Sequence, residues 1–126
     1  MRAIDTHVLI RLLAEDDLPQ LASAEKFVQP GAWVSDLALV EAIWVLEANY
    51  KLTPREQADA IEMLIDHHEL VLQSPEAIKA ALQMFRSKPA LGFSDCLILE
   101  IARHAGHLPL GTFDRSLAKM AGAQKL

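Results

Sequence analysis

Short apolar runs alternate with longer helical segments along the whole chain, and this alternation restricts the possible folds more than any other feature. The runs at residues 1–5, 32–35, 70–73 and 107–113 have the length and composition of strands. Helical segments lie at 6–15, 18–29, 54–68, 75–87, 95–105 and 114–121, and another runs from residue 35 to a connector at 50–53. Strands that alternate with helices pair in parallel and carry helices on both faces. The predicted fold is a three-layer α/β/α sandwich with a central parallel sheet of four or five strands.

Helix signals support these boundaries. Pro54 follows Thr53 and Pro75 follows Ser74, so each proline occupies the first helical position behind a capping hydroxyl. Ser94 is expected to cap the segment at 95–105, and Gly106 to end it.

The length predicts one domain over residues 1–126. A chain of 126 residues is long enough to bury one core that covers roughly two thirds of its unfolded surface. No apolar run approaches the roughly 18 residues that a membrane span requires, and the first residues lack a basic region followed by a long apolar run. We therefore expect a cytoplasmic protein without a membrane partner.

Composition excludes two classes of function. Seventeen acidic and twelve basic residues give a net charge of −5, which argues against binding nucleic acid through bulk positive charge. A nucleic-acid role would require bound divalent cations to offset the acids. Cys96 is the only cysteine, so an internal disulfide is impossible, and its helical, apolar context indicates a buried hydrophobe rather than a catalytic thiol.

One glutamate interrupts the apolar run "LALVEAIWVL". At about 100° per residue, Glu41 shares a helix face with a stripe that is expected to pack on the sheet. That stripe consists of Leu37, Ala38, Trp44, Val45 and Ala48. A second stripe lies opposite and consists of Leu39, Ile43, Leu46 and Tyr50. The helix is therefore apolar almost all round, and a solvated edge position for Glu41 is an equally open interpretation.

Three aspartates have related positions. Asp5 and Asp114 each follow a short strand directly, at the carboxyl end where ligand crevices form in open α/β sheets. Asp95 opens a helix on the face of Ile98 and Leu99. Each aspartate alone also fits a cap or a favourable charge in a first helical turn.

Convergence of the four acids would require a cation. Two carboxylates about 4 Å apart repel each other by on the order of 4 kcal/mol at an effective dielectric of 20. Such a cluster persists only when it takes up protons or binds a cation. Oxygen ligands without histidine or cysteine favour Mg²⁺ or Mn²⁺ over zinc.

Four segments resemble the acidic motifs of PIN-domain ribonucleases. They are "IDTHVLIRLL" (4–13), "VSDLALVEAIWVL" (34–46), "FSDCLILEIA" (93–102) and "TFDRSL" (112–117). Their order, their spacing and the chain length are most similar to the VapC toxins of toxin–antitoxin pairs. The resemblance implies a metal-dependent endoribonuclease, a hydrolase of RNA phosphodiester bonds, with an antitoxin partner and a homodimeric state.

The same resemblance assigns roles to individual residues. It implies that Asp5, Glu41, Asp95 and Asp114 form the catalytic site and hold one or two Mg²⁺ or Mn²⁺ ions. Supporting positions fall on Thr6 and Thr112. Arg115 is expected to contact a substrate phosphate because it follows Asp114 directly, although it also fits an ordinary exposed helix-start arginine. His7 stands where many members carry Asn. Other cations expected to contact RNA are Arg2, Arg11 and Lys88.

Partner surfaces are expected where apolar side chains exceed what the core uses. The stripe of Leu39, Ile43, Leu46 and Tyr50 is the predicted interface, unless residues 54–65 cover it within the same molecule. By the resemblance, an antitoxin would place a helix or an extended tail in a hydrophobic groove.

Four alternatives fit less well. The histidine pairs His67/His68 and His104/His107 lack the partners of a zinc motif. A phosphoacceptor receiver domain requires paired acids after the first strand, an aspartate after the middle strand and a lysine after the last, which this sequence lacks. A haloacid-dehalogenase-type phosphatase requires a second aspartate at the position of His7. A PIN fold that has lost catalysis and acts only as an interaction module remains an alternative, against which the four intact acids argue.

Overall fold

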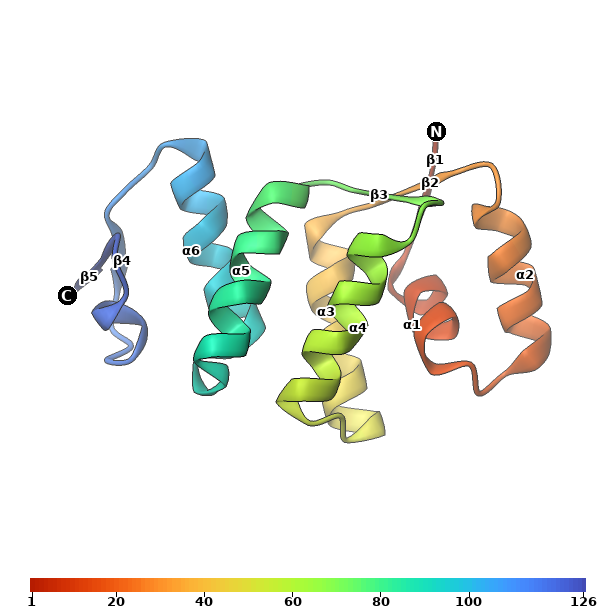
Figure 1. Ribbon diagram of the computed structural model, residues 1–126, viewed down its shortest axis with the longest axis horizontal. Helices are drawn as coiled ribbons and strands as arrows, with labels where there is room; N and C mark the ends of the chain where they lie inside the picture. The colour runs from red at the N-terminus through yellow and green to blue at the C-terminus, as the bar shows by residue number, and fades with distance from the viewer. The chain divides into compact units, whose positions relative to one another are not determined.

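Short parallel strands alternate with helices along the chain (Figure 1). The computed structural model describes residues 1–126, which divide into two units, Met1–Pro75 and Glu76–Leu126. The elements of the first unit are β1 (Arg2–Ile4), α1 (Thr6–Ala14), α2 (Leu18–Val28), β2 (Ala32–Val34), α3 (Asp36–Tyr50), α4 (Pro54–Asp66) and β3 (Leu70–Leu72). The remaining elements are α5 (Pro75–Ser87), the 3₁₀ helix η1 (Pro89–Leu91), α6 (Phe93–Ala105), β4 (Leu110–Thr112), the 3₁₀ helix η2 (Leu117–Lys119) and β5 (Ala123–Lys125).

All strand pairing is parallel, which confirms the predicted α/β class. In the first unit the strands are ordered β1-β2-β3, and in the second unit β4 pairs with β5. The register aligns Ile4 with Val34 and Val34 with Leu72, and all three side chains are buried. The five strands thus form a sheet of three and a sheet of two. Because Asp5 follows Ile4 directly, it leaves the three-stranded sheet at its carboxyl edge, as predicted.

Side-chain caps fix where several helices begin. Thr53 accepts a hydrogen bond from the Glu56 amide, and Glu56 accepts one from the Thr53 amide, which completes a capping box behind Pro54. Gly106, with φ 82°, ends α6 as predicted. The prediction for Ser94 is wrong, because α6 begins at Phe93 with Gly92 in the cap position and no side-chain cap.

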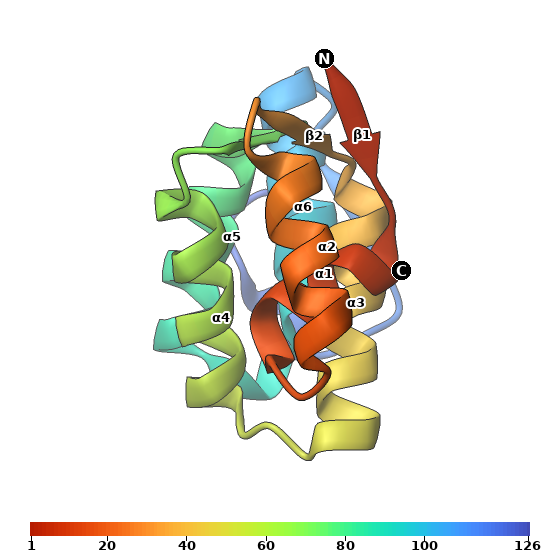
Figure 2. The ribbon, with the colours of Figure 1, turned by 90° about the vertical axis from the view of Figure 1, so that its right-hand side faces the viewer.

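Helix α3 buries the face opposite to the one predicted to pack on the sheet. It contacts α1 (Figure 2) and α4. It buries Ala38, Leu39, Ala42, Ile43 and Leu46. Leu37 and Trp44, which share the face of Glu41, are 66% and 56% exposed. The expectation that Leu39, Ile43 and Leu46 form a partner surface is therefore wrong. Both faces are apolar, so periodicity alone could not choose between them; Ala42, which is small, lies on the face that packs.

The end of the chain also differs from prediction. The strand expected at 107–113 is reduced to Leu110–Thr112, since Pro109 has no amide to extend a ladder. The helix expected at 114–121 is a turn followed by the short η2, which ends before the strand β5. No helix is long and apolar enough to cross a membrane.

Candidate functional site

Asp95 and Asp114 form an acidic pair in the second unit. Asp95 lies in the first turn of α6 and is half-buried, whereas Asp114 follows β4 and is exposed. Burial of the Asp95 carboxyl raises its pKa, and the nearby negative charge of Asp114 raises it further. A first-turn carboxylate is normally favoured by the helix dipole. In Asp95, burial and the charge of Asp114 outweigh that benefit.

Backbone hydrogen bonds hold Asp114 in place. Its Oδ1 accepts from the Leu117 amide at 2.7 Å, and its own amide donates to Thr112 Oγ1 at 3.0 Å. Thr112 therefore stabilises the turn that carries Asp114. Arg115 is the next residue of this turn and is exposed. The Asp114 carboxylate keeps one oxygen, Oδ2, that accepts none of these bonds.

Asp5 is the N-cap of α1. Its Oδ1 accepts from the Val8 amide at 3.1 Å, and it lines a pocket of about 400 Å³ together with His7, Arg11 and Phe27. Thr6 is the first residue of α1 and is half-buried, and His7 is exposed. Asp5 thus has the local geometry of a cap and also opens onto a cavity, so the capping role and a ligand role are compatible.

Glu41 lies in the second turn of α3 and is exposed. Its helix packs against α1, which begins directly after Asp5, and both helices follow neighbouring parallel strands of one sheet. The solvated-edge interpretation of Glu41 is therefore correct as a description of its surroundings. Glu41 makes no hydrogen bond to Asp5 and has no cationic partner.

Asp36 is an acid that sequence reasoning did not single out. Its Oδ2 accepts from the Ser74 hydroxyl at 2.7 Å, its amide donates to Gln73 Oε1 at 2.9 Å, and its Oδ1 is buried without a partner. These contacts join the start of α3 to the residues after β3. A carboxylate in a first helical turn next to the Ser35 cap was the available signal, but such acids are common.

Cys96 and the histidines do not extend the acidic pair. Cys96 is fully buried, and burial together with the charge of Asp95 raises the pKa of its thiol to about 11, as expected for an inert core residue. His67 accepts from the Glu69 amide, and His104 is hydrogen-bonded to the Glu100 carbonyl. Within neither unit do three side chains of His, Cys, Asp or Glu lie together as a complete metal cage.

Comparison with known families decides the classification. A model of the PIN domain matches residues 3–123, which is nearly the whole chain. The chain belongs to the PIN domain family. No curated protein and no solved structure is significantly similar to it.

Membership in the PIN family confirms the fold class predicted from the sequence, an α/β/α PIN-like fold with parallel strands. PIN domains have a nuclease-type fold and in general use divalent metal ions. The donor set of this PIN domain fits such an ion, since Asp95 and Asp114 offer hard carboxylate oxygens whose mutual repulsion is not neutralised by any ion pair.

Proposed function

We propose that this PIN domain, a single domain over residues 1–126, is a metal-dependent endoribonuclease and the toxin of a toxin–antitoxin pair in the cytoplasm. The observation that carries the proposal is the pair Asp95–Asp114, in which one carboxyl has a raised pKa because of burial and because of the other. The PIN match includes both residues, and it also includes Asp5 and Glu41.

The proposed site consists of Asp5, Glu41, Asp95 and Asp114, which would hold Mg²⁺ or Mn²⁺, with Thr6 and Thr112 in support. When bound, the ion would polarise the scissile phosphate of RNA and lower the pKa of the attacking water. Thr112 Oγ1 accepts from the Asp114 amide and fixes its backbone, and the Leu117 amide orients the Asp114 carboxylate. One of the four carboxylates would take up the proton that the attacking water releases. Arg115 would contact a substrate phosphate from the turn.

A pair of matched substitutions tests the activity. Asp5 and Asp17 are both N-caps, of α1 and α2, and each accepts an amide hydrogen bond three residues on. Because Asn caps a helix as well as Asp does, Asp5→Asn and Asp17→Asn should both fold. We expect Asp17→Asn to cleave a synthetic single-stranded RNA in Mg²⁺ or Mn²⁺, and Asp5→Asn to be inactive. Wild-type activity in Asp5→Asn would refute the proposed role of the carboxylates.

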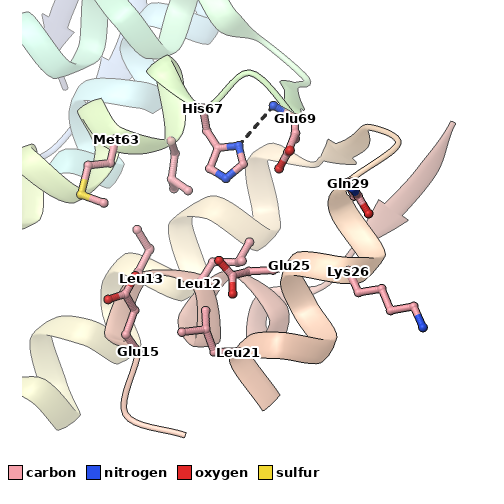
Figure 3. Close-up of a pocket in the computed structure, with 11 residues that line it drawn as sticks. Leu12, Leu13, Glu15, Leu21, Glu25, Lys26, Gln29, Met63, His67 and Glu69 are labelled. Carbon is pink, nitrogen blue, oxygen red and sulfur yellow. Dashed lines mark hydrogen bonds between the residues drawn. The ribbon is translucent and has the colours of Figure 1, made fainter. Parts of the chain in front are cut away.

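The proposed antitoxin site is a groove in the first unit. A pocket of about 440 Å³ lies among α1, α2 and α4 (Figure 3), and a second of about 390 Å³ adjoins it. Leu13 and Met63 line both pockets, so the two hollows adjoin at these residues. Met63 is 59% exposed, and an exposed methionine suits the binding of an apolar helix face.

Charge indicates which helix the groove would accept. Carboxylates on its walls outnumber the one cation, Lys26, and they are Glu15, Asp16, Glu25, Glu56, Asp59 and Glu69. We therefore propose an amphipathic antitoxin helix with lysine or arginine beside its apolar stripe. The product of a small reading frame next to the gene should copurify with the wild type and not with Met63→Glu. Val71→Glu, at a similarly exposed apolar position outside the groove, is the matched control.

A homodimer is proposed through the exposed face of α3. Leu37 and Trp44 are large, apolar and exposed on that face, and patches of this kind mark interfaces in soluble proteins. Light scattering should give a dimer for the wild type and a monomer for Trp44→Glu. A monomeric wild type would refute this part of the proposal.

A further inference from the structure

Three cations of the second unit have no partner. Lys79 pairs with Glu76, Arg103 pairs with Glu100 and bonds to the Ala121 carbonyl, and Lys125 donates to the Phe113 carbonyl. Arg86 also has an interaction. The cations that form neither an ion pair nor a side-chain hydrogen bond are Lys88, Arg115 and Lys119, and all three are exposed. Within the second unit, the positive charge that has no partner is therefore confined to two segments, 88–92 and 115–119.

Two of these cations line one cavity. A pocket of about 380 Å³ is bounded by Lys88 and Lys119, by the hydroxyl-bearing Ser116, and by apolar residues. The apolar residues are Pro89, Ala90, Leu91 and Met120. The pocket thus combines an apolar lining with two ammonium groups and a hydroxyl. A nucleotide offers the complementary combination of a flat apolar base, a ribose and an anionic phosphate.

The walls of the pocket are the segments that carry the acidic pair. Residues 88–92 lead directly into α6, whose first turn contains Asp95. Ser116 follows Asp114 by two residues, in the turn whose shape is set by the bond from the Leu117 amide to Asp114 Oδ1. A strand of RNA with one phosphate at Asp95 and Asp114 would therefore meet this pocket with a neighbouring nucleotide.

We infer that the pocket lined by Lys88, Ser116 and Lys119 is a nucleotide subsite that binds single-stranded RNA beside the cleaved bond, with the two lysines on backbone phosphates. The inference rests on the proposed ribonuclease function and adds to it the place where the substrate is held. Charge favours RNA over a protein helix here, because the antitoxin groove is lined by acids whereas this pocket contains two lysines and no carboxylate.

The test is the salt dependence of RNA binding. Binding of a fluorescent single-stranded oligoribonucleotide is measured by anisotropy, with Ca²⁺ in place of Mg²⁺ to suspend cleavage. For single strands the slope of log K against log salt is about −0.7 for each phosphate contact. The double variant Lys88→Gln/Lys119→Gln should lose about 1.4 from the magnitude of this slope, which amounts to about 25-fold weaker binding at 0.1 M salt if the affinities at 1 M are equal.

Two further variants separate the possible outcomes. Lys88→Arg/Lys119→Arg keeps the charge and should restore the slope. Lys51→Gln/Arg55→Gln removes two exposed, unpaired cations of the first unit that do not line the antitoxin groove. The change in net charge is the same, and the slope should stay nearly unchanged.

An unchanged slope in Lys88→Gln/Lys119→Gln, in a wild type that binds and cleaves RNA, overturns the subsite and leaves the ribonuclease intact. An equal decrease of the slope in both Gln double variants also overturns the subsite, because the effect is then one of net charge. If Lys88→Gln/Lys119→Gln instead abolishes copurification of the antitoxin and leaves RNA binding intact, the pocket is a protein-binding surface and the inference is wrong. A wild type that neither binds nor cleaves RNA refutes the proposed function and the subsite together.

Discussion

Replacing Asp95 with Asn should stabilise the metal-free protein and abolish its stabilisation by metal. Asp95 is half-buried beside Asp114, and its pKa is raised by burial and by that neighbour. A raised pKa in a folded acid means that its charge costs stability at neutral pH. Asn has nearly the same shape and no charge, so the cost should disappear.

The size of the effect follows from the surroundings of the pair. At a separation of about 4 Å, two carboxylates repel each other by ~1 kcal/mol in water and ~4 kcal/mol at an effective dielectric of 20, and the repulsion falls as the separation grows. Asp114 is exposed, which favours the lower figure. Asp95→Asn also loses the favourable interaction of the charge with the dipole of α6, which reduces the gain by ~0.3–1 kcal/mol. Burial of the Asp95 carboxyl adds a desolvation cost to the repulsion, and since its pKa is raised overall, we expect a net gain of up to about 1 kcal/mol. An unfolding entropy of about 2.1 cal/mol/K per residue over 126 residues converts this to a rise in Tm of up to about 4 °C.

The dependence on pH has a definite sign. Above the raised pKa the wild type carries the unfavourable charge and Asp95→Asn is the more stable protein. As pH falls through that pKa, Asp95 takes up a proton and the wild type recovers the difference. The gap in Tm should therefore be largest near pH 8 and should close below about pH 4, where Asp95 is neutral in the folded and unfolded states.

Bound metal should make the wild type more stable than Asp95→Asn. At a hundredfold excess over its Kd, a bound ion stabilises the folded protein by about 2.7 kcal/mol, or roughly 10 °C in Tm. We expect this shift with Mn²⁺ in the wild type and little of it in Asp95→Asn. Glu25→Gln removes one exposed carboxylate elsewhere and should match the wild type in both conditions. The reasoning fails if Asp95→Asn is the less stable protein in chelator at pH 8, or if it retains the Mn²⁺ shift.

Three other substitutions have expected outcomes. Glu41→Gln should change stability by less than about 0.5 kcal/mol, since Glu41 is exposed, yet should lower RNA cleavage about 10- to 100-fold in a gel assay. Thr112→Val removes the acceptor of the Asp114 amide and should lower the free energy of unfolding in chemical denaturation by about 0.5–1 kcal/mol. It should also raise the Mn²⁺ concentration needed for half-saturation, whereas Thr112→Ser should keep the wild-type stability and Mn²⁺ affinity. Phe113 is 76% exposed and adjoins Asp114, so Phe113→Leu should weaken binding of single-stranded RNA about 5- to 150-fold by loss of base stacking, whereas Phe113→Tyr should not.

The sequence predicted the positions that depend on local order. Asp5 follows β1 directly and Asp114 follows β4 after one residue, so their placement requires only that each strand ends nearby. Asp95 required only that α6 begin nearby, and an error in its cap, Gly92 rather than Ser94, did not move it out of the first turn. Strand ends and helix starts are set by neighbouring residues, which explains why these predictions held.

Positions that depend on distant partners could not be predicted in this way. Arg2 was expected to contact RNA, but its guanidinium lies 3.9 Å from the centroid of the Phe27 ring and donates to the Phe27 carbonyl. Arg11 is likewise engaged, with Asp16, Gln20 and the Tyr50 hydroxyl. Lys88 and Arg115 remain free. The availability of a cation depends on residues far along the chain, and only the folded structure shows which cations are left for a substrate.

Helix α3 shows the same limit for an entire face. Its apolar residues surround the axis, so sequence periodicity gave two solutions, and tertiary packing chose the one that buries Leu39 and Ile43. This choice places Glu41 in solvent with Leu37 and Trp44 as exposed neighbours. A carboxylate in that setting contributes nothing to the core, and no cation pairs with it. Its presence in an otherwise apolar segment is therefore not accounted for by stability, which is the reason to look for its role in binding a metal ion.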